Sequence, residues 1–256
     1  MSNDEYDETR DLWNRVADDG RMQVGEEEDS HRMLNAAPVL WACAGDVNGL
    51  TVLDAGCGTG YVSKKLYDRG ARVTGIDFSE RMIEVARAHN PHIDFRVDSC
   101  TQLATIDDEH FDLVIANYVL MDTPDLQGTM HAFYRVLKPD GVVVVVFSHP
   151  CFMQAGATVS DNGEEIRYRW SFPYFEQRKC VDPPWAHFTA EFIWFHRPLS
   201  DYWKAFRAAG FVVVDFEEPR MMAERYHRAK TARQLKNSQT RPTSVAFKLQ
   251  KQQKAA

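Results

Sequence analysis

The chain has 256 residues, a mass of 29.4 kDa and 44% hydrophobic residues, which suffices for one α/β domain with an additional segment. Its formal net charge of −7 and pI near 5.7 provide no overall basic field, so we do not expect DNA or bulk RNA as partners. The acidic N-terminus and the lack of an apolar run of ~20 residues predict no signal peptide, no membrane span and a cytoplasmic location.

Cysteine usage also limits the class of protein. The five cysteines are odd in number and form no C-x-x-C pattern. We therefore expect a reducing compartment, with neither a disulfide framework nor a metal site.

Two helical patterns precede the first strand pattern. Residues 4–18 are partly amphipathic and include the aromatic residues Tyr6 and Trp13. Residues 30–44 form a second pattern that contains Pro38, which predicts a kink or two pieces.

Residues 51–61, T-V-L-D-A-G-C-G-T-G-Y, combine a strand that ends in Asp54, three alternating glycines and a helix start. Glycine can adopt positive φ and leaves room for a ligand, and a helix N-terminus exposes unpaired N–H groups. A second strand, residues 72–76, is followed by Asp77, whose carboxylate can accept both hydroxyls of a ribose. These features predict a nucleoside ligand.

The spacing of the glycines indicates which nucleoside. A dinucleotide fingerprint needs a small residue where this chain has Tyr61. The pattern D-x-G-x-G-x-G instead resembles motif I of the class I S-adenosylmethionine (SAM) dependent methyltransferases, and Asp77 lies where that family has its ribose-binding acid. The resemblance runs from about Leu50 to Leu249, with the specific motifs in the first half.

This resemblance implies SAM as cofactor and a Rossmann-like α/β fold. The expected fold is a seven-stranded, mostly parallel sheet with helices on both faces, an antiparallel last strand and a small aromatic-rich cap. The expected organisation is a helical lid (1–45), a SAM-binding core (46–150), an acceptor-binding cap (151–198) and a C-terminal completion of the core (199–256).

The resemblance also implies several cofactor contacts. Asp98 follows the third strand, where the family's acid receives the adenine amino group; a solvated loop aspartate is the alternative. Asn117 and Tyr118 follow the fourth strand, residues 111–116, where motif IV faces the methionine portion. An N-terminal helix often covers the cofactor in this family, so Tyr6 and Trp13 could supply aromatic faces, or could simply pack the helix on the body. The expected cofactor-binding residues are Tyr6, Trp13, Asp54, Gly56, Cys57, Gly58, Gly60, Tyr61, Asp77, Phe78, Asp98, Ser99, Asn117 and Tyr118.

The fifth strand pattern, V-V-V-V-V-F at residues 142–147, is continuously apolar and predicts a strand covered on both faces. His149 follows it, at the carboxyl end of the sheet where ligands bind. An ordinary pKa near ~6.5 makes His149 our first candidate for a general base, with Tyr118 as a second catalytic candidate. The alternative is that His149 only orders the turn before Pro150.

Residues 151–198 are rich in aromatic side chains. Alternation in residues 166–172 and 191–197 predicts two strands of a cap over the pocket, joined through the Pro183-Pro184 loop. An aromatic cap favours a flat or apolar acceptor, although many of these side chains could form a cap core without touching it. The expected acceptor contacts are His149, Tyr174, Trp185, His187 and His196.

Residues 199–256 complete the core pattern. A helix over 199–209 is expected to begin at Ser200 as N-cap, and strands are expected at 211–216 and 244–249. Between them, residues 221–237 predict a basic surface helix.

The expected function is a SAM-dependent methyltransferase that methylates an O, N or C nucleophile of a small aromatic or apolar acceptor. A base is needed only if that nucleophile is protonated. The alternatives are a SAM-binding cyclase or cofactor-sensing module and, with less support, an NAD(P)-dependent oxidoreductase. The oligomeric state stays open, with a homodimer as one option.

Overall fold

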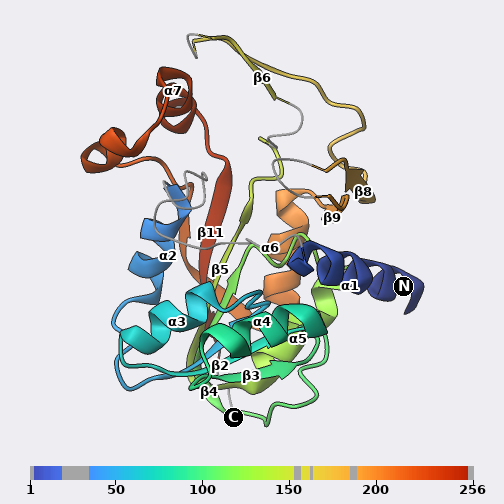
Figure 1. Ribbon diagram of the computed structural model, residues 1–256, viewed down its shortest axis with the longest axis vertical. Helices are drawn as coiled ribbons and strands as arrows, with labels where there is room; N and C mark the ends of the chain where they lie inside the picture. The colour runs from blue at the N-terminus through green and yellow to red at the C-terminus, as the bar shows by residue number, and fades with distance from the viewer. Residues whose placement is uncertain (1–2, 19–34, 153–156, 162–163, 185–188, 253–256) are drawn as a thin grey trace.

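The computed structural model describes residues 3–18, 35–152, 157–161, 164–184 and 189–252. Its centre is a seven-stranded sheet in the order β10-β11-β5-β4-β1-β2-β3 (Figure 1). Strands β1 to β5 are parallel, and β11 is antiparallel to both of its neighbours. The predicted fold class and the antiparallel last strand are confirmed.

The strands of this sheet are β1 (Thr51–Ala55), β2 (Arg72–Asp77), β3 (Asp94–Val97), β4 (Phe111–Asn117), β5 (Leu137–Ser148), β10 (Phe211–Glu217) and β11 (Ser244–Lys251). The helices that pack on it are α2 (Ala37–Ala44), α3 (Tyr61–Asp68), α4 (Glu80–His89), α5 (Leu126–Val136) and α6 (Leu199–Ala208). Helix α1 (Asn3–Asp18) precedes them.

Two hydrophobic cores cover the two faces of the sheet. Helices α5 and α6 pack on one face, and α2, α3 and α4 pack on the other. Strand β5 contributes alternately to both, with Val143 and Val145 in the first core and Val144 and Val146 in the second. The prediction of a strand buried on both faces is therefore confirmed.

Local side-chain chemistry explains some helix starts and not others. The Ser79 hydroxyl caps α4 by accepting from the Met82 N–H at 3.1 Å. Ser200 is not the cap of α6, because that helix begins after Pro198 without a side-chain cap. Pro38 lies in the first turn of α2, where proline is tolerated, and residues 30–34 of the predicted helix lie outside the described residues.

The cap segment differs from its prediction. Strand β7 (Ile166–Tyr168) pairs with β6 (Ala157–Val159), and β9 (Phe192–His196) pairs with β8 (Arg178–Asp182). The predicted strands therefore belong to two separate hairpins, which lie toward the upper right in Figure 1. The prediction missed β8 because its sequence, R-K-C-V-D, has no apolar alternation.

The prediction of one continuous helix over residues 221–237 is also wrong. A 3-10 helix, η3 (Ala223–Arg228), and helix α7 (Ala232–Thr240) replace it. Thr231 is extended between them, and its hydroxyl accepts from the Gln234 N–H at 3.0 Å, which starts a new helix.

Helix α1 is docked between the core and the cap. The side chain of Asn14 bonds both the Ser79 hydroxyl, at 2.6 Å, and the Glu80 carboxylate, at 3.1 Å. On the other side, Lys179 of β8 forms an ion pair with Glu8. Apolar residues of α1, including Leu12, pack with β9. Helix α1 thus connects α4 to the hairpin of β8 and β9.

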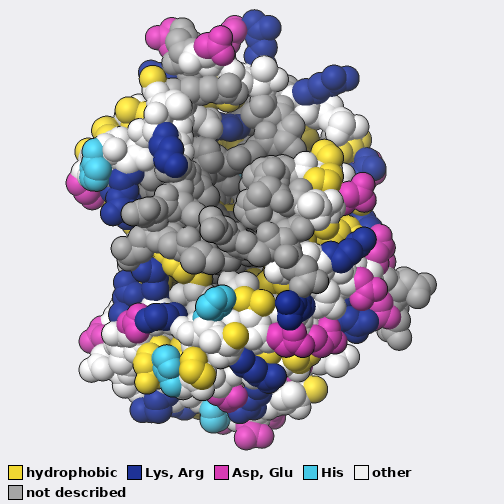
Figure 2. Space-filling view, viewed as in Figure 1, with side chains coloured by type: hydrophobic (Ala, Val, Ile, Leu, Met, Phe, Trp, Pro, Cys, Tyr) yellow, Lys and Arg dark blue, Asp and Glu magenta, His cyan; other side chains and the backbone are white. Residues whose placement is uncertain are grey.

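The surface in Figure 2 carries acidic and basic side chains with hydrophobic ones between them. Within the described residues, no helix has the length and apolarity needed to cross a bilayer.

The stacked pair of Phe147 and Tyr202 provides a test of the core. Phe147 is fully buried, and its ring centroid lies 4.3 Å from that of Tyr202. We expect Phe147→Ala to lower the free energy of unfolding by about 3–5 kcal/mol, because it removes a buried ring and leaves a cavity. Phe175→Ala, at a ring that is 81% exposed, should change it by no more than about 0.5 kcal/mol. Urea denaturation measures both values, and equal effects would contradict this packing.

Candidate functional site

The glycine turn after β1 has a conformation that side chains would obstruct. Gly56, Gly58 and Gly60 have φ values of +69°, +53° and +86°. A Cβ atom on Gly56 would lie 2.4 Å from a methyl group of Val119, and one on Gly60 would lie 2.8 Å from the Phe95 ring. A Cβ on Gly58 would meet no protein atom within 4 Å. Close packing against Val119 and Phe95 therefore explains why positions 56 and 60 are glycines, whereas Gly58 faces open space.

Two buried acids lie beside this turn. The Asp77 carboxylate accepts from the Gly58 N–H at 3.0 Å and from the Ser79 N–H at 2.9 Å. The Asp54 carboxylate accepts from the Ser63 hydroxyl at 2.5 Å. Asp77 thus fastens the glycine turn to the start of α4, and its oxygens keep further acceptor capacity.

Burial changes the acidity of both groups. Desolvation raises the pKa of Asp54 to about 7, although the hydrogen bonds from Ser63 oppose this rise. Desolvation likewise raises the pKa of Asp77 to about 6, against the bonds from Ser79 and Gly58. Perturbed acids in a concave site are typical of binding or catalytic positions.

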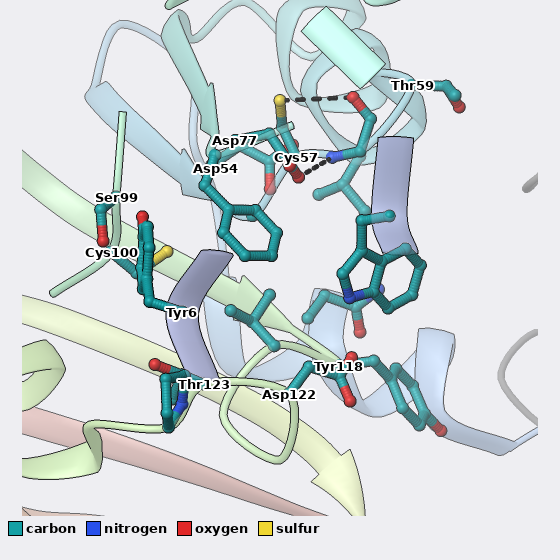
Figure 3. Close-up of a pocket in the computed structure, with 18 residues that line it drawn as sticks. Tyr6, Asp54, Cys57, Thr59, Asp77, Ser99, Cys100, Tyr118, Asp122 and Thr123 are labelled. Atoms are coloured by element: carbon teal, nitrogen blue, oxygen red, sulfur yellow. Dashed lines mark hydrogen bonds between the residues drawn. The ribbon is translucent and has the colours of Figure 1, made fainter. Parts of the chain in front are cut away.

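A cavity of about 840 Å³, including its solvent-open mouth, adjoins these acids. It is lined by Tyr6, Trp13, Asp54, Gly56, Cys57, Gly58, Thr59, Val62, Asp77, Phe78, Ser99, Cys100, Asn117, Tyr118, Val119, Asp122, Thr123 and Pro124. In Figure 3, Asp54 and Asp77 lie on one side of it, and Tyr118, Asp122 and Thr123 lie on the other. The lining comes from α1, from the first turn of α3 and from the carboxyl ends of β1, β2, β3 and β4 with the segments that follow them.

Helix α1 places two aromatic side chains over this cavity. The Tyr6 ring contacts Phe78 edge-to-face, with centroids 5.6 Å apart. Burial raises the pKa of the Tyr6 phenol to about 12, against a hydrogen bond with Ser99. Trp13 lines the cavity and also contacts Phe192 of the cap, at 6.1 Å between centroids. Tyr6 and Trp13 therefore both line the cavity and pack against neighbouring rings; their contact with the cofactor stays a prediction.

The wall opposite the acids is the segment after β4. Tyr118 has a positive φ of 59°, which is uncommon for a residue with a side chain. Its phenol shares a hydrogen bond of 2.5 Å with the Ser244 hydroxyl of β11. The side chain is thereby held toward β11, while Asn117 and residues 119 and 122–124 complete this wall.

A buried arginine of the cap holds this wall in place. The Arg197 guanidinium donates to the carbonyl oxygens of Leu120 at 3.3 Å, Thr123 at 2.7 Å and Pro124 at 2.8 Å. Two residues earlier, the Phe195 N–H donates to the Met121 carbonyl at 2.7 Å. The conformation of residues 120–124 therefore depends on the residues at the end of β9.

Some expected site residues lie away from this cavity lining. Most of the expected cofactor-binding residues line it, but Gly60, Tyr61 and Asp98 do not, and of the expected acceptor contacts His149, Tyr174 and His196 do not. Trp185 and His187 lie outside the described residues. The Tyr174 hydroxyl is engaged with the Leu199 N–H at 2.9 Å and the Cys151 thiol at 3.2 Å.

Asp98 organises its own loop. One of its oxygens accepts from the Ser99 N–H at 2.7 Å and the Ala104 N–H at 3.1 Å. The other accepts from the backbone N–H and the hydroxyl of Thr105, at 2.7 and 2.6 Å. This geometry agrees better with an indirect role of Asp98, in which it positions Ser99 at the cavity, than with a direct contact between Asp98 and a ligand.

His149 is buried with both ring nitrogens engaged. Its Nδ1 accepts from the Cys151 N–H at 3.1 Å, so the neutral ring carries its proton on Nε2, which lies 3.0 Å from the Glu218 carboxylate. Burial lowers the pKa of His149, and Glu218 opposes this. This geometry agrees with the alternative that His149 orders the turn before Pro150; its role as a base stays a prediction.

Several lining residues were not predicted from the sequence. These are Thr59, Val62, Cys100, Val119, Asp122, Thr123 and Pro124. Each lies within a few residues of a predicted site residue, so position along the chain was the available signal. The described residues contain no group of three or more His, Cys, Asp or Glu side chains that could hold a metal ion.

Comparisons with known proteins agree with this geometry. A family model described as a methyltransferase domain matches residues 53–145. The demethylmenaquinone methyltransferase of Lactococcus lactis is 30% identical over 189 residues, which cover 68% of this chain and 70% of that protein. The ubiquinone biosynthesis O-methyltransferase of Alkalilimnicola ehrlichii is 37% identical over 106 residues, covering 40% and 43%.

A solved structure supports the fold. The S-adenosylmethionine dependent methyltransferase of Mesorhizobium loti superposes with a TM-score of 0.72 at 21% identity, covering 89% of this chain and 100% of that one. This chain belongs to the class I SAM-dependent methyltransferases. It is an enzyme that uses SAM, and membership in this family overturns the alternative of a nicotinamide-dependent oxidoreductase.

The cavity has the chemistry that this cofactor requires. Asp77 offers a buried acceptor beside the glycine turn, and Gly58 leaves the turn open toward a ligand. When bound, SAM supplies an electrophilic methyl group on a sulfonium.

The raised pKa of Asp77 predicts a pH effect on stability. Its folded-state pKa is about 6, against an ordinary value of 3.8, so ionisation destabilises the folded protein as the pH rises from 3.8 through about 6. The difference corresponds to about 3 kcal/mol. We therefore expect the unfolding free energy of the wild type, relative to Asp77→Asn, to fall by roughly that amount between pH 4 and pH 7.5. Urea denaturation at several pH values measures this.

Asp107→Asn, at an exposed acid, serves as the control variant and is measured at the same pH values. A pH-independent difference between the wild type and Asp77→Asn would contradict the buried, desolvated state of Asp77.

The Arg197 contacts predict a loss of stability. Arg197→Met keeps an apolar stem but leaves three buried carbonyl contacts without their donor, so we expect a loss of about 2–4 kcal/mol. Arg197→Lys should recover only part of this loss of stability, because an ammonium group cannot reproduce the forked geometry of the guanidinium. Arg167→Met, at an exposed cap arginine, should cost no more than about 0.5 kcal/mol. Chemical denaturation of the three variants measures these values. Equal losses in Arg197→Met and Arg167→Met would show that Arg197 does not form the contacts with the three carbonyl groups.

Proposed function

We propose that this enzyme methylates an O, N or C nucleophile of a small aromatic or apolar acceptor, using the cavity of Figure 3 for the cofactor. The observation that carries the proposal is the buried Asp77 carboxylate, which lines the cavity while bonded to the glycine turn. In this assignment Asp77 holds the ribose hydroxyls, Ser99 and Cys100 lie at the adenine, and Asn117 lies at the methionine portion.

The aromatic residues Tyr6, Trp13 and Phe78 would cover the cofactor from the lid formed by residues 1–45 and from the end of β2. Their ring faces favour a cationic group, and α1 would exclude water. Alignment and exclusion of water are the main contributions that the chain's own residues make to such a transfer.

The acceptor would lie between the wall after β4 and the cap, residues 151–198. The names of two relatives support an aromatic acceptor, because the Lactococcus protein is named for demethylmenaquinone and the Alkalilimnicola protein for ubiquinone biosynthesis. The net charge of −7 favours such a small molecule over a nucleic acid.

A general base is required only for a protonated nucleophile. His149 remains our proposed candidate, but in this role it would have to release its bond to Glu218 or to the Cys151 N–H. Tyr118 would have to release Ser244 in the same way.

A matched pair of glycine variants tests the cofactor site. Gly58 and Gly49 both have positive φ, and a Cβ atom added to either would have no protein atom within 4 Å, but only Gly58 lines the cavity. We expect calorimetric titration with S-adenosylhomocysteine to show micromolar binding to the wild type and to Gly49→Ala. Gly58→Ala should bind at least about tenfold more weakly, because its methyl group occupies ligand space.

The backbone strain is similar in the two variants, so their unfolding free energies should fall by a similar amount of about 1 kcal/mol. Equal affinities of Gly58→Ala and Gly49→Ala for S-adenosylhomocysteine would contradict the proposed site. Absence of binding to the folded wild type would contradict the use of this cavity for the cofactor.

A further inference from the structure

His196 is the last residue of β9 and lies among four aromatic side chains. The centroid of its ring is 6.2 Å from Trp170, 4.9 Å from Phe172, 5.7 Å from Tyr174 and 6.1 Å from Trp194. The four rings meet the imidazole edge-on, and His196 is only 1% exposed. We call these four rings and His196 the aromatic box.

The hydrogen bonds of His196 define its tautomer. Its Nε2 lies 2.8 Å from the backbone carbonyl oxygen of Tyr174, and a carbonyl only accepts, so Nε2 carries a proton. In the neutral ring Nδ1 is then an acceptor with a lone pair. This atom is buried and has no hydrogen-bond partner in the part of the chain that the structure describes.

A second unpaired polar atom belongs to the same box. The indole Nε1–H of Trp194 is buried and, across the described residues, also lacks an acceptor. A buried polar group without a partner costs about 1–3 kcal/mol, and such groups in native proteins normally bond to something. A ligand that donates to one of these two groups and accepts from the other would satisfy both.

The chemistry of the box specifies this ligand. Nδ1 of His196 needs a donor and Nε1 of Trp194 needs an acceptor, and a hydroxyl group on an aromatic ring can supply both kinds of atom. The surrounding rings would contact the edges and faces of a planar ligand. The Arg178 guanidinium lies 4.9 Å from the Phe172 ring, and its charge disfavours a cationic ligand.

The box is attached to the wall of the cofactor cavity. The residues on either side of His196 hold this wall, Phe195 through the Met121 carbonyl and Arg197 through the Thr123 and Pro124 carbonyls. The residues before and after His196 are therefore both bonded to the wall, and they fix the position of His196 in the strand.

Trp170 is the most exposed of the four rings. It is 41% exposed, whereas Phe172, Tyr174 and Trp194 are partly buried, and it follows β7 in an irregular part of the chain, so its displacement breaks no strand pairing. The imidazole, in contrast, is held by its bond to Tyr174.

We propose that the aromatic box is the acceptor-recognition subsite and that the acceptor is a planar aromatic compound bearing a hydroxyl group, of the phenol or catechol type, whose hydroxyl donates to His196 Nδ1. This inference rests on the proposed function, because it names the substrate class of that site. His196 Nδ1 would accept a hydrogen bond from the hydroxyl of the aromatic compound. The Trp194 N–H would donate a hydrogen bond to an oxygen of the same compound.

The experiment uses 4-nitrocatechol, a coloured aromatic diol, as the probe. The full-length protein is first saturated with S-adenosylhomocysteine and then titrated with the probe, while the absorbance of the probe and the calorimetric heat are recorded. We expect saturable binding to the wild type. His196→Phe keeps a ring but removes the acceptor atom, and should weaken probe binding at least about tenfold. Trp194→Phe, which removes the N–H donor and keeps an aromatic ring, should weaken it about three- to tenfold.

Three controls separate recognition from folding. Both variants should bind S-adenosylhomocysteine within about twofold of the wild type, and Trp203→Phe, at a half-exposed tryptophan of α6, should bind the probe like the wild type. On the wild type itself, 1,2-dimethoxy-4-nitrobenzene has no hydroxyl donor and should bind at least about tenfold more weakly than 4-nitrocatechol.

The outcomes that overturn this inference differ from those that overturn the proposed function. If S-adenosylhomocysteine binds but 4-nitrocatechol does not, or binds no better than its dimethoxy analogue, the hydroxyl-recognition subsite is wrong and the cofactor site stands. Equal affinity of His196→Phe and the wild type for the probe has the same meaning. Failure of S-adenosylhomocysteine to bind would contradict the proposed function itself.

Discussion

The hydrogen bonds of the Asp77 carboxylate are the constraint on which the site depends. They join the Gly58 N–H, in the turn after β1, to the Ser79 N–H, at the start of α4. Ser79 in turn bonds Asn14, so the position of α1 depends on the same cluster. Burial of this carboxylate opposes its ionisation and lowers stability. A purely structural tie could use a neutral side chain, so the presence of an acid at a cavity suits a ligand that donates hydrogen bonds.

The parts of the fold that were predictable from sequence are those that local chemistry decides. The turn after β1 needs positive φ at Gly56, Gly58 and Gly60, a backbone conformation that glycine adopts most readily. The five consecutive valines of β5 fit only a strand buried on two faces. Each of these two patterns spans fewer than about ten residues, so it could be recognised without knowledge of distant contacts.

The parts that could not be predicted depend on contacts between distant residues. His149 was interpretable as a base from its place at the end of β5, but its partner Glu218 lies 69 residues away. The Arg197 contact with Thr123 spans 74 residues. The pairing of β9 with β8 was missed for a related reason, because a short polar strand gives no pattern of its own and is stabilised by its partner.

This contrast between local and distant contacts also separates the two halves of the pocket. The acids and glycines on one side of the cavity are positioned by their own strands and turns. The opposite wall is positioned by Arg197 and Phe195, which belong to the cap. A change in the cap can therefore reshape this wall while the hydrogen bonds of Asp77 stay intact. Under the function proposed above, this arrangement would let the acceptor side vary with an inserted segment while the sheet keeps the cofactor site.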